Sequence, residues 1–167
     1  MIALSHDHHA GLLFCWKIKE GLRKDIPLHK ILKYINFFWA GHLKEHFGEE
    51  EALLFNRLDD NLTRQGISEH LMLGARLDHL NHYENENAAE YLSFAELLIK
   101  HIRFEERTLF PHLETHLPES ALKLVGEYFS EKHPTAFKMI FRMSSGRKTM
   151  CYHERRTDKR YNCSGDL

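Results

Sequence analysis

Apolar residues recur at helical spacing along most of the chain, as Leu12, Cys15, Ile18 and Leu22 do in the first segment. No stretch alternates apolar and polar residues over the length that a strand needs. Prolines occur only at positions 27, 111, 118 and 134, so helix breaks are few. The pattern predicts an all-α protein with helices over about residues 4–22, 27–58, 68–83, 88–116 and 118–132.

The ends of these helices are indicated by capping residues and helix breakers. Asp25, followed two residues later by a proline, is interpreted as the N-cap of the second helix. The polar residues 59–61 end that helix, and Gly66 opens the third. Pro111 falls inside the fourth pattern and is expected to kink the helix or narrow its end.

Four long amphipathic helices with short connections predict an up-down-up-down four-helix bundle, followed by a short fifth helix. The bundle is expected to form one domain, residues 1–140, and residues 141–167 a basic, disordered tail. The tail has almost no aliphatic residues with which to form a core. Cys151, His153 and Cys163 are too few for a closed zinc site.

Composition narrows the functional classes. Of the 167 residues 43% are apolar and 28% are charged, and the formal net charge of -1 gives no argument for binding nucleic acid or an anionic membrane. No secretory signal is visible, and three scattered cysteines suit a reducing compartment, so the protein is expected in the cytoplasm. The unusual feature is the 14 histidines, because histidine is the commonest metal ligand.

Two helices place a histidine and a glutamate four residues apart on a face that is otherwise apolar. In the fourth predicted helix these residues are His101 and Glu105, while Glu106 is expected to face solvent. In the second helix they are His46 and Glu50. A buried carboxylate is costly unless it is paired with a positive group or coordinates a cation. The repetition of this pair therefore favours metal binding.

The other two long helices each turn one histidine toward the core. In the first helix the apolar face is centred near His8, and His9 would enter only if the helix started late or were distorted. In the third helix His70 shares the leucine face, whereas His79 lies on the opposite side. His42 is expected to be an outer-layer group or an alternative ligand.

The predicted ligands are four imidazoles and two carboxylates: His8, His46, Glu50, His70, His101 and Glu105. They are too many for one tetrahedral zinc and too rich in nitrogen for calcium or magnesium. They suit two non-haem iron ions bridged by both carboxylates and by an oxo or hydroxo group, with manganese or zinc as alternatives. Open positions would accept oxygen, nitric oxide or peroxide. The metal-free alternative is a helical interaction module with pH-sensitive core histidines.

These six residues occur in four short motifs. The motifs are Asp7-His8, His46-Phe-Gly-Glu-Glu50, Glu69-His70 and His101-Ile-Arg-Phe-Glu105, and the fourth motif continues to Leu-Phe-Pro111. In order and spacing the motifs resemble the hemerythrin-like, or HHE cation-binding, domains over about residues 4–116. The resemblance implies a four-helix bundle around a non-haem di-iron centre, with the same six side chains as ligands.

The sequence departs from the oxygen-carrying members of that family at one position. Those proteins have a second histidine one turn after the first on the third helix, and here that position is Gly74. The resemblance therefore favours sensing or binding of oxygen, nitric oxide or iron, as in a stress response, over reversible oxygen carriage. The alternative is an enzyme-like role in peroxide or nitric oxide handling, iron storage or iron donation for iron-sulfur cluster repair. Protein partners are left open.

Overall fold

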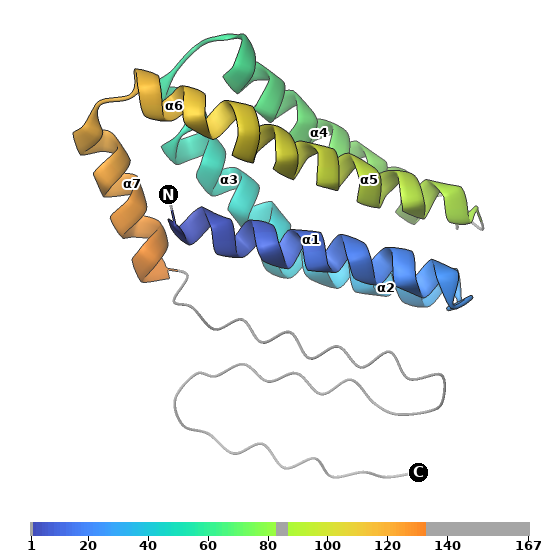
Figure 1. Ribbon diagram of the computed structural model, residues 1–167. Helices are drawn as coiled ribbons and strands as arrows, with labels where there is room; N and C mark the ends of the chain where they lie inside the picture. Colours follow the sequence, from blue (N-terminus) through green and yellow to red (C-terminus); the bar gives the residue numbers. More distant parts are fainter. Residues whose placement is uncertain (1, 83–86, 133–167) are drawn as a thin grey trace, which may run out of the picture. The chain divides into compact units, whose positions relative to one another are not determined.

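The computed structural model describes residues 2–82 and 87–132 (Figure 1), in which all regular secondary structure is helical. The predicted tail and the predicted domain boundary at residue 140 lie outside the described residues. The elements are α1 (Ile2–Arg23), α2 (Leu28–Phe38), η1 (Trp39–Leu43), α3 (Lys44–Leu53), η2 (Phe55–Arg57), α4 (Asn61–His82), α5 (Ala88–Phe104), η3 (Glu105–Leu109), α6 (Phe110–His116) and α7 (Glu119–Lys132).

The long helical segments form the predicted up-down-up-down four-helix bundle. Helix α1 packs beside α2 and α5, and α4 packs beside α5 and α2. The chain reverses direction from α1 to the α2–α3 segment, again to α4, and again to α5 (Figure 1). Helix α7 is the predicted short fifth helix. The Lys132 ammonium at its end forms ion pairs with Glu45 (2.7 Å) and Glu49, which hold α7 against α3. Among the described helices, none is both long enough and apolar enough to cross a membrane.

The bundle interior contains an apolar cluster at each end. At one end, which we call the aromatic end, the Phe14 ring stacks on Phe38 with centroids 4.1 Å apart and meets Tyr34 and Phe94 at 5.3 and 6.4 Å. The cluster near α7 consists of Leu54, Phe55, Leu109, Phe110, Leu113, Val125 and Phe129. Along the helices, the predicted ligands fall between these two clusters.

The prediction for Asp25 is wrong. Its φ of 50° is left-handed, and it ends α1 rather than capping α2. The Ile26 N–H donates to the Gly21 carbonyl (3.0 Å) and the Asp25 N–H to the Leu22 carbonyl (3.1 Å), which is a Schellman motif. Aspartate tolerates the left-handed region better than most residues, so a local polar signal was assigned to the wrong helix end.

The start of α4 is also earlier than predicted. The Asp60 carboxylate accepts hydrogen bonds from the Leu62 and Thr63 N–H groups at 2.9 and 3.0 Å, so the polar residues that end one helical segment also cap the next. Gly66 therefore lies inside the helix and does not open it. A Cβ at Gly66 would lie 3.0 Å from both Phe55 and Leu109, so glycine allows close packing there.

The second and fourth predicted helices each contain a widened turn. The π-helical segments η1 and η3 interrupt what the sequence predicts as continuous α-helices. Segment η3 begins at Glu105 and ends shortly before Pro111, which has no N–H to donate and lies in the first turn of α6. The predicted local disturbance is therefore present, but as a widening before the proline. π-Helical turns are rare overall, and those that occur are often found at functional sites.

Candidate metal centre

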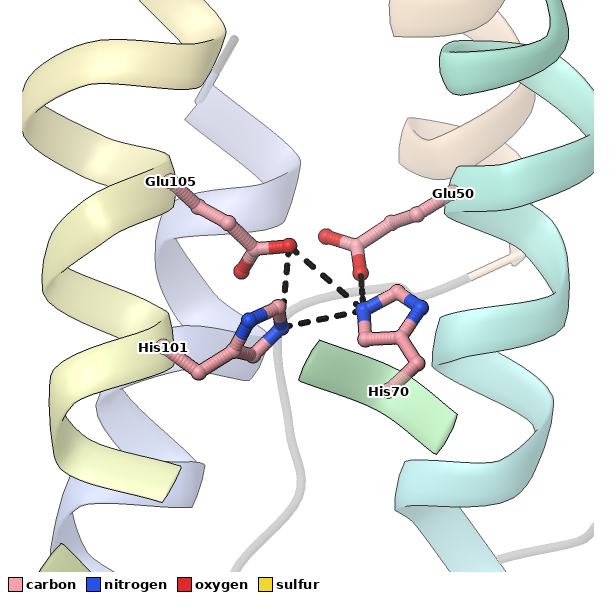
Figure 2. Close-up of side chains that lie close together, drawn as sticks. All are labelled: Glu50, His70, His101 and Glu105. Carbon is pink, nitrogen blue, oxygen red and sulfur yellow. Dashed lines mark hydrogen bonds and ion pairs between the residues drawn. The ribbon is translucent and has the colours of Figure 1, made fainter. Parts of the chain in front are cut away.

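All six predicted ligands lie together in the interior, with exposed fractions between 0% and 7%. They come from α1, α3, α4, α5 and η3, and are His8, His46, Glu50, His70, His101 and Glu105. Figure 2 shows four of them converging, with the two carboxylates opposite each other. We call these six side chains the polar centre.

The Glu50 carboxylate turns its two oxygens toward different imidazoles. Its Oε1 lies 3.1 Å from His46 Nε2 and 3.7 Å from His8 Nε2. Its Oε2 lies 3.6 Å from His70 Nε2. Glu50 therefore stands between two groups of imidazole nitrogens.

The Glu105 carboxylate repeats this arrangement from the opposite side. Its Oε1 lies 3.1 Å from His101 Nε2 and 3.7 Å from His70 Nε2, and its Oε2 lies 3.2 Å from His8 Nε2. Each carboxylate thus presents one oxygen to the His8 side and the other to the His70–His101 side. The two carboxylates therefore lie between two sets of imidazoles, a donor set that could hold metal ions.

The hydrogen bonding of the polar centre is incomplete in a way that fits a cation. All four oxygens of Glu50 and Glu105 are buried, and none has a hydrogen-bond partner within the part of the chain that the structure describes. Buried carboxylate oxygens are normally hydrogen-bonded or coordinate a metal. The side chains also fall into two groups whose ligand atoms lie within 4.8 Å of one another, one group with His8 and His46 and one with His70 and His101.

The facing nitrogens of His70 and His101 give the strongest geometric indication that a cation binds between the two rings. Their Nε2 atoms are 2.9 Å apart, while their Nδ1 atoms contact the carboxylates of Glu51 and Glu69 at 2.7 and 2.9 Å. Because an ionised carboxylate only accepts, each Nδ1 carries a proton. Without a cation, one ring must carry a second proton on Nε2. Two nitrogens bound at right angles to one ion, each at about 2.1 Å, would lie about 3 Å apart.

The charges of the polar centre favour protonated imidazoles when no metal is bound. Burial lowers the pKa of His8, but the carboxylates of Glu105 and Glu50 outweigh burial and raise it to about 10. Burial likewise opposes ionisation of His101, and Glu105 raises its pKa to about 9. Burial and mutual repulsion would raise the pKa values of both glutamates, but the imidazoles hold them below the ordinary value. A cation would therefore replace protons.

Four further carboxylates lie next to the outward Nδ1 atoms of the histidines, and sequence reasoning missed their role. Glu106, expected to face solvent, has an oxygen 3.5 Å from His8 Nδ1. The positions of the four carboxylates next to predicted ligands in the sequence could have indicated this role. A residue next to a ligand on a helix is turned by about 100° from it, and here it faces the ligand of a neighbouring helix. The four are Asp7, Glu51, Glu69 and Glu106.

The remaining candidates lie away from the two groups. His9 and His79 are exposed, as predicted. The His42 ring packs against Phe38 with centroids 5.0 Å apart, and His42 belongs to neither group. Cys15 is a buried core residue, as the sequence predicts, and burial raises the pKa of its thiol to about 12.

Gly74 faces an aromatic ring. A Cβ at this position would lie 3.8 Å from the nearest atom of the Trp39 indole, which comes from η1. The Trp39 ring in turn contacts Phe47 edge to face, with centroids 5.8 Å apart. A Cβ at position 74 would therefore be in ordinary van der Waals contact with the indole.

Comparison with known families agrees with the geometry. The chain matches the model of the hemerythrin HHE cation binding domain over residues 1–113. This match covers more than half of the chain, and the protein therefore belongs to the hemerythrin HHE cation-binding family. No curated protein and no solved structure gives a significant match. The matched region contains all six side chains of the polar centre, and α7 lies beyond it.

Proposed function

We propose that this protein is a cytoplasmic non-haem di-iron protein that binds or senses oxygen, nitric oxide or iron. The observation that carries the proposal is the division of the four buried carboxylate oxygens of Glu50 and Glu105 between two imidazole pairs. Mixed imidazole and carboxylate ligands with open positions are typical of non-haem iron. Two such positions share both carboxylates, which supports a pair of ions.

The side chains around the polar centre support a site that excludes bulk water. The His70 ring lies between Phe47 and Phe55, with centroid distances of 3.9 and 5.6 Å, and the His8 ring stacks on Phe110 at 5.4 Å. Iron held there would supply a change of oxidation state and open positions for a small ligand. The chain itself would hold the ions, orient the imidazoles and keep the surroundings apolar. A diatomic molecule or peroxide is small enough for such a site.

Metal analysis tests the proposal directly. Protein expressed with iron and purified without chelators should contain about two iron ions per chain and show the near-ultraviolet absorption of a bridged iron pair. His101→Ala should lower the iron content, while the exposed His9→Ala, beside a predicted ligand, should leave it unchanged. Less than one transition-metal ion per chain in the unmodified protein would contradict the proposal.

Turnover separates binding from the enzyme-like alternative. The iron-loaded protein is compared with an equal concentration of free iron for consumption of hydrogen peroxide and of nitric oxide. Rates no higher than those of free iron support binding or sensing. Multiple turnovers well above that level, lost in His101→Ala, would favour peroxide or nitric oxide handling.

A further inference from the structure

The two imidazole pairs of the polar centre are held in different ways. Glu50 lies within ligand distance of both pairs, whereas Glu105 groups with His70 and His101 and reaches the other pair only through His8, at 3.2 Å. The carboxylates therefore favour the position of His70 and His101 as well. A second difference lies behind the rings, at the Nδ1 atoms that point away from the polar centre. A metal-bound histidine commonly donates this second ring N–H to a carboxylate, which fixes the tautomer and the orientation of the ring.

On the side of His70 and His101, both outward contacts are short. His70 Nδ1 lies 2.7 Å from the Glu51 carboxylate, and His101 Nδ1 lies 2.9 Å from that of Glu69. Glu69 is itself held, because the Gln65 amide donates to its other oxygen at 2.8 Å. In both rings these contacts fix the proton on Nδ1 and the orientation of the ring, so that Nε2 is the nitrogen directed toward the ion.

Aromatic packing also restrains this pair. The Phe47 ring stacks on His70 with centroids 3.9 Å apart and an interplanar angle of 11°. The same ring meets His101 edge to face at 5.4 Å. One phenylalanine thus contacts both imidazoles, which limits their rotation before any ion arrives.

On the other side, the outward contacts are longer. His8 Nδ1 lies 3.5 Å from Glu106, and His46 Nδ1 lies 3.7 Å from Asp7. Both Nδ1 atoms are buried and make no hydrogen bond within the described residues. The second oxygen of Glu106 accepts from the Arg103 guanidinium at 2.6 Å, which draws that carboxylate toward another partner. An ion bound by this pair must first reorient the rings, and that cost weakens binding.

We propose that the position between His70 and His101 binds its ion first and more tightly, and that the position between His8 and His46 binds the second, exchangeable ion. Glu51 and Glu69 are then positioning residues, which act on the metal through the two histidines. This inference rests on the proposed two-ion centre and adds an order of filling to it. The matching carboxylate on the weak side, Glu106, has no such effect on the first ion.

The test is a titration of metal-free protein with Co²⁺, followed by visible absorption and calorimetry. The unmodified protein should bind two ions in two resolved steps, with dissociation constants at least about ten-fold apart. His46→Ala should keep the tight step and lose the weak one. His101→Ala should lose the tight step. Unfolding of each metal-free variant, followed by circular dichroism, verifies that the bundle is intact.

The positioning residues are tested by truncation and by conservative rescue. Glu69→Ala or Glu51→Ala should weaken the first step about ten- to hundred-fold. Glu69→Gln, which keeps an acceptor oxygen for the ring N–H, should recover part of this loss. A purely structural role would not distinguish glutamine from alanine in this way. Glu106→Ala is the matched control and should leave the first dissociation constant within about two-fold.

Each outcome separates this inference from the proposed function. Two ions bound with one indistinguishable affinity, or loss of the tight step in His46→Ala, would overturn the order of filling and leave the two-ion centre standing. An equal effect of Glu106→Ala and Glu69→Ala on the first step would overturn the positioning role. Failure of the unmodified protein to bind two ions would refute the proposed function itself.

Discussion

The aromatic end and the polar centre share α1 and α5, yet they stabilise the protein differently. At the aromatic end Phe14, Phe38 and Phe94 pack ring against ring and bury apolar surface, which favours folding without any ligand. The polar centre buries two carboxylates and four imidazoles, and its carboxylate oxygens have no hydrogen-bond partner among the described residues. Burying such groups opposes folding unless a positive charge compensates them.

The bundle thus separates two tasks along its length, which are holding the helices together and binding metal. The aromatic end and the cluster near α7 hold the helices together on both sides of the polar centre. The polar centre can therefore keep its charged groups ready for an ion while the two apolar clusters supply most of the stability of the metal-free protein. Metal binding should then add stability that the apolar regions do not depend on.

The largest effect is expected at the aromatic end. Phe14→Ala should destabilise the protein by about 3 to 5 kcal/mol, because it removes a fully buried ring and leaves a cavity. The loss should be similar in metal-free and metal-loaded protein, as measured by urea unfolding. Trp16→Ala is the control, since its side chain is 57% exposed, and it should cost far less. A loss from Phe14→Ala that appeared only with metal bound would break the separation.

Removing a ligand should act mainly through the metal. His101→Ala is expected to lower metal content and to remove most of the stabilisation that bound metal provides, about 3 kcal/mol at a free metal concentration near one hundred times the dissociation constant. Thermal unfolding with and without metal measures this difference. The exposed His79 offers the control, and His79→Ala should change neither quantity. Equal effects of both substitutions would show that the centre does not bind the metal.

A smaller effect is expected from pH in the metal-free protein. The pKa values of His8 and His101, about 10 and about 9 when folded, lie above the value of about 6.5 expected in the unfolded chain. Their protonation therefore stabilises the fold fully below about pH 6.5, and this stabilisation is lost as the pH rises through the folded values.

The measurement is the urea midpoint of metal-free protein between about pH 7 and about pH 9, which should fall as the pH rises. Because the pKa of Cys15 is raised on folding, its thiol adds a slope of the same sign above about pH 8, so the midpoints at or below that pH carry the test. His101→Ala should flatten the dependence. A midpoint that rose over this range would contradict the protonation of the polar centre.

The smallest effect is expected at the turn after α1, which belongs to neither the aromatic end nor the polar centre. Asp25→Gly should stabilise the protein by about 1 kcal/mol, because glycine adopts the left-handed backbone of this position without steric cost. The gain should be the same with and without metal in urea unfolding. Lys24→Gly, one residue earlier, should destabilise instead, since that position has no positive φ. A gain that depended on metal would link this turn to the centre.

Most of the fold and of the candidate site could be predicted from the sequence because the relevant signal is local. A helix turns by about 100° per residue, so His101 and Glu105 had to share a face, and His9 had to leave the face of His8. The same local reasoning was wrong for Asp25 and Gly66. Aspartate is favoured at N-caps but also tolerates the left-handed backbone at the end of a helix, and glycine serves both as a breaker and as a site of close packing.

The sequence by itself determined which histidines and glutamates turn inward, because helical periodicity depends only on residues a few positions apart. The tertiary structure alone decided how those faces meet. It set one oxygen of Glu50 toward His46 and the other toward His70, and it placed Glu69 of α4 behind His101 of α5. These contacts join residues far apart in the chain, and their geometry depends on the register and rotation of packed helices, which no local pattern encodes.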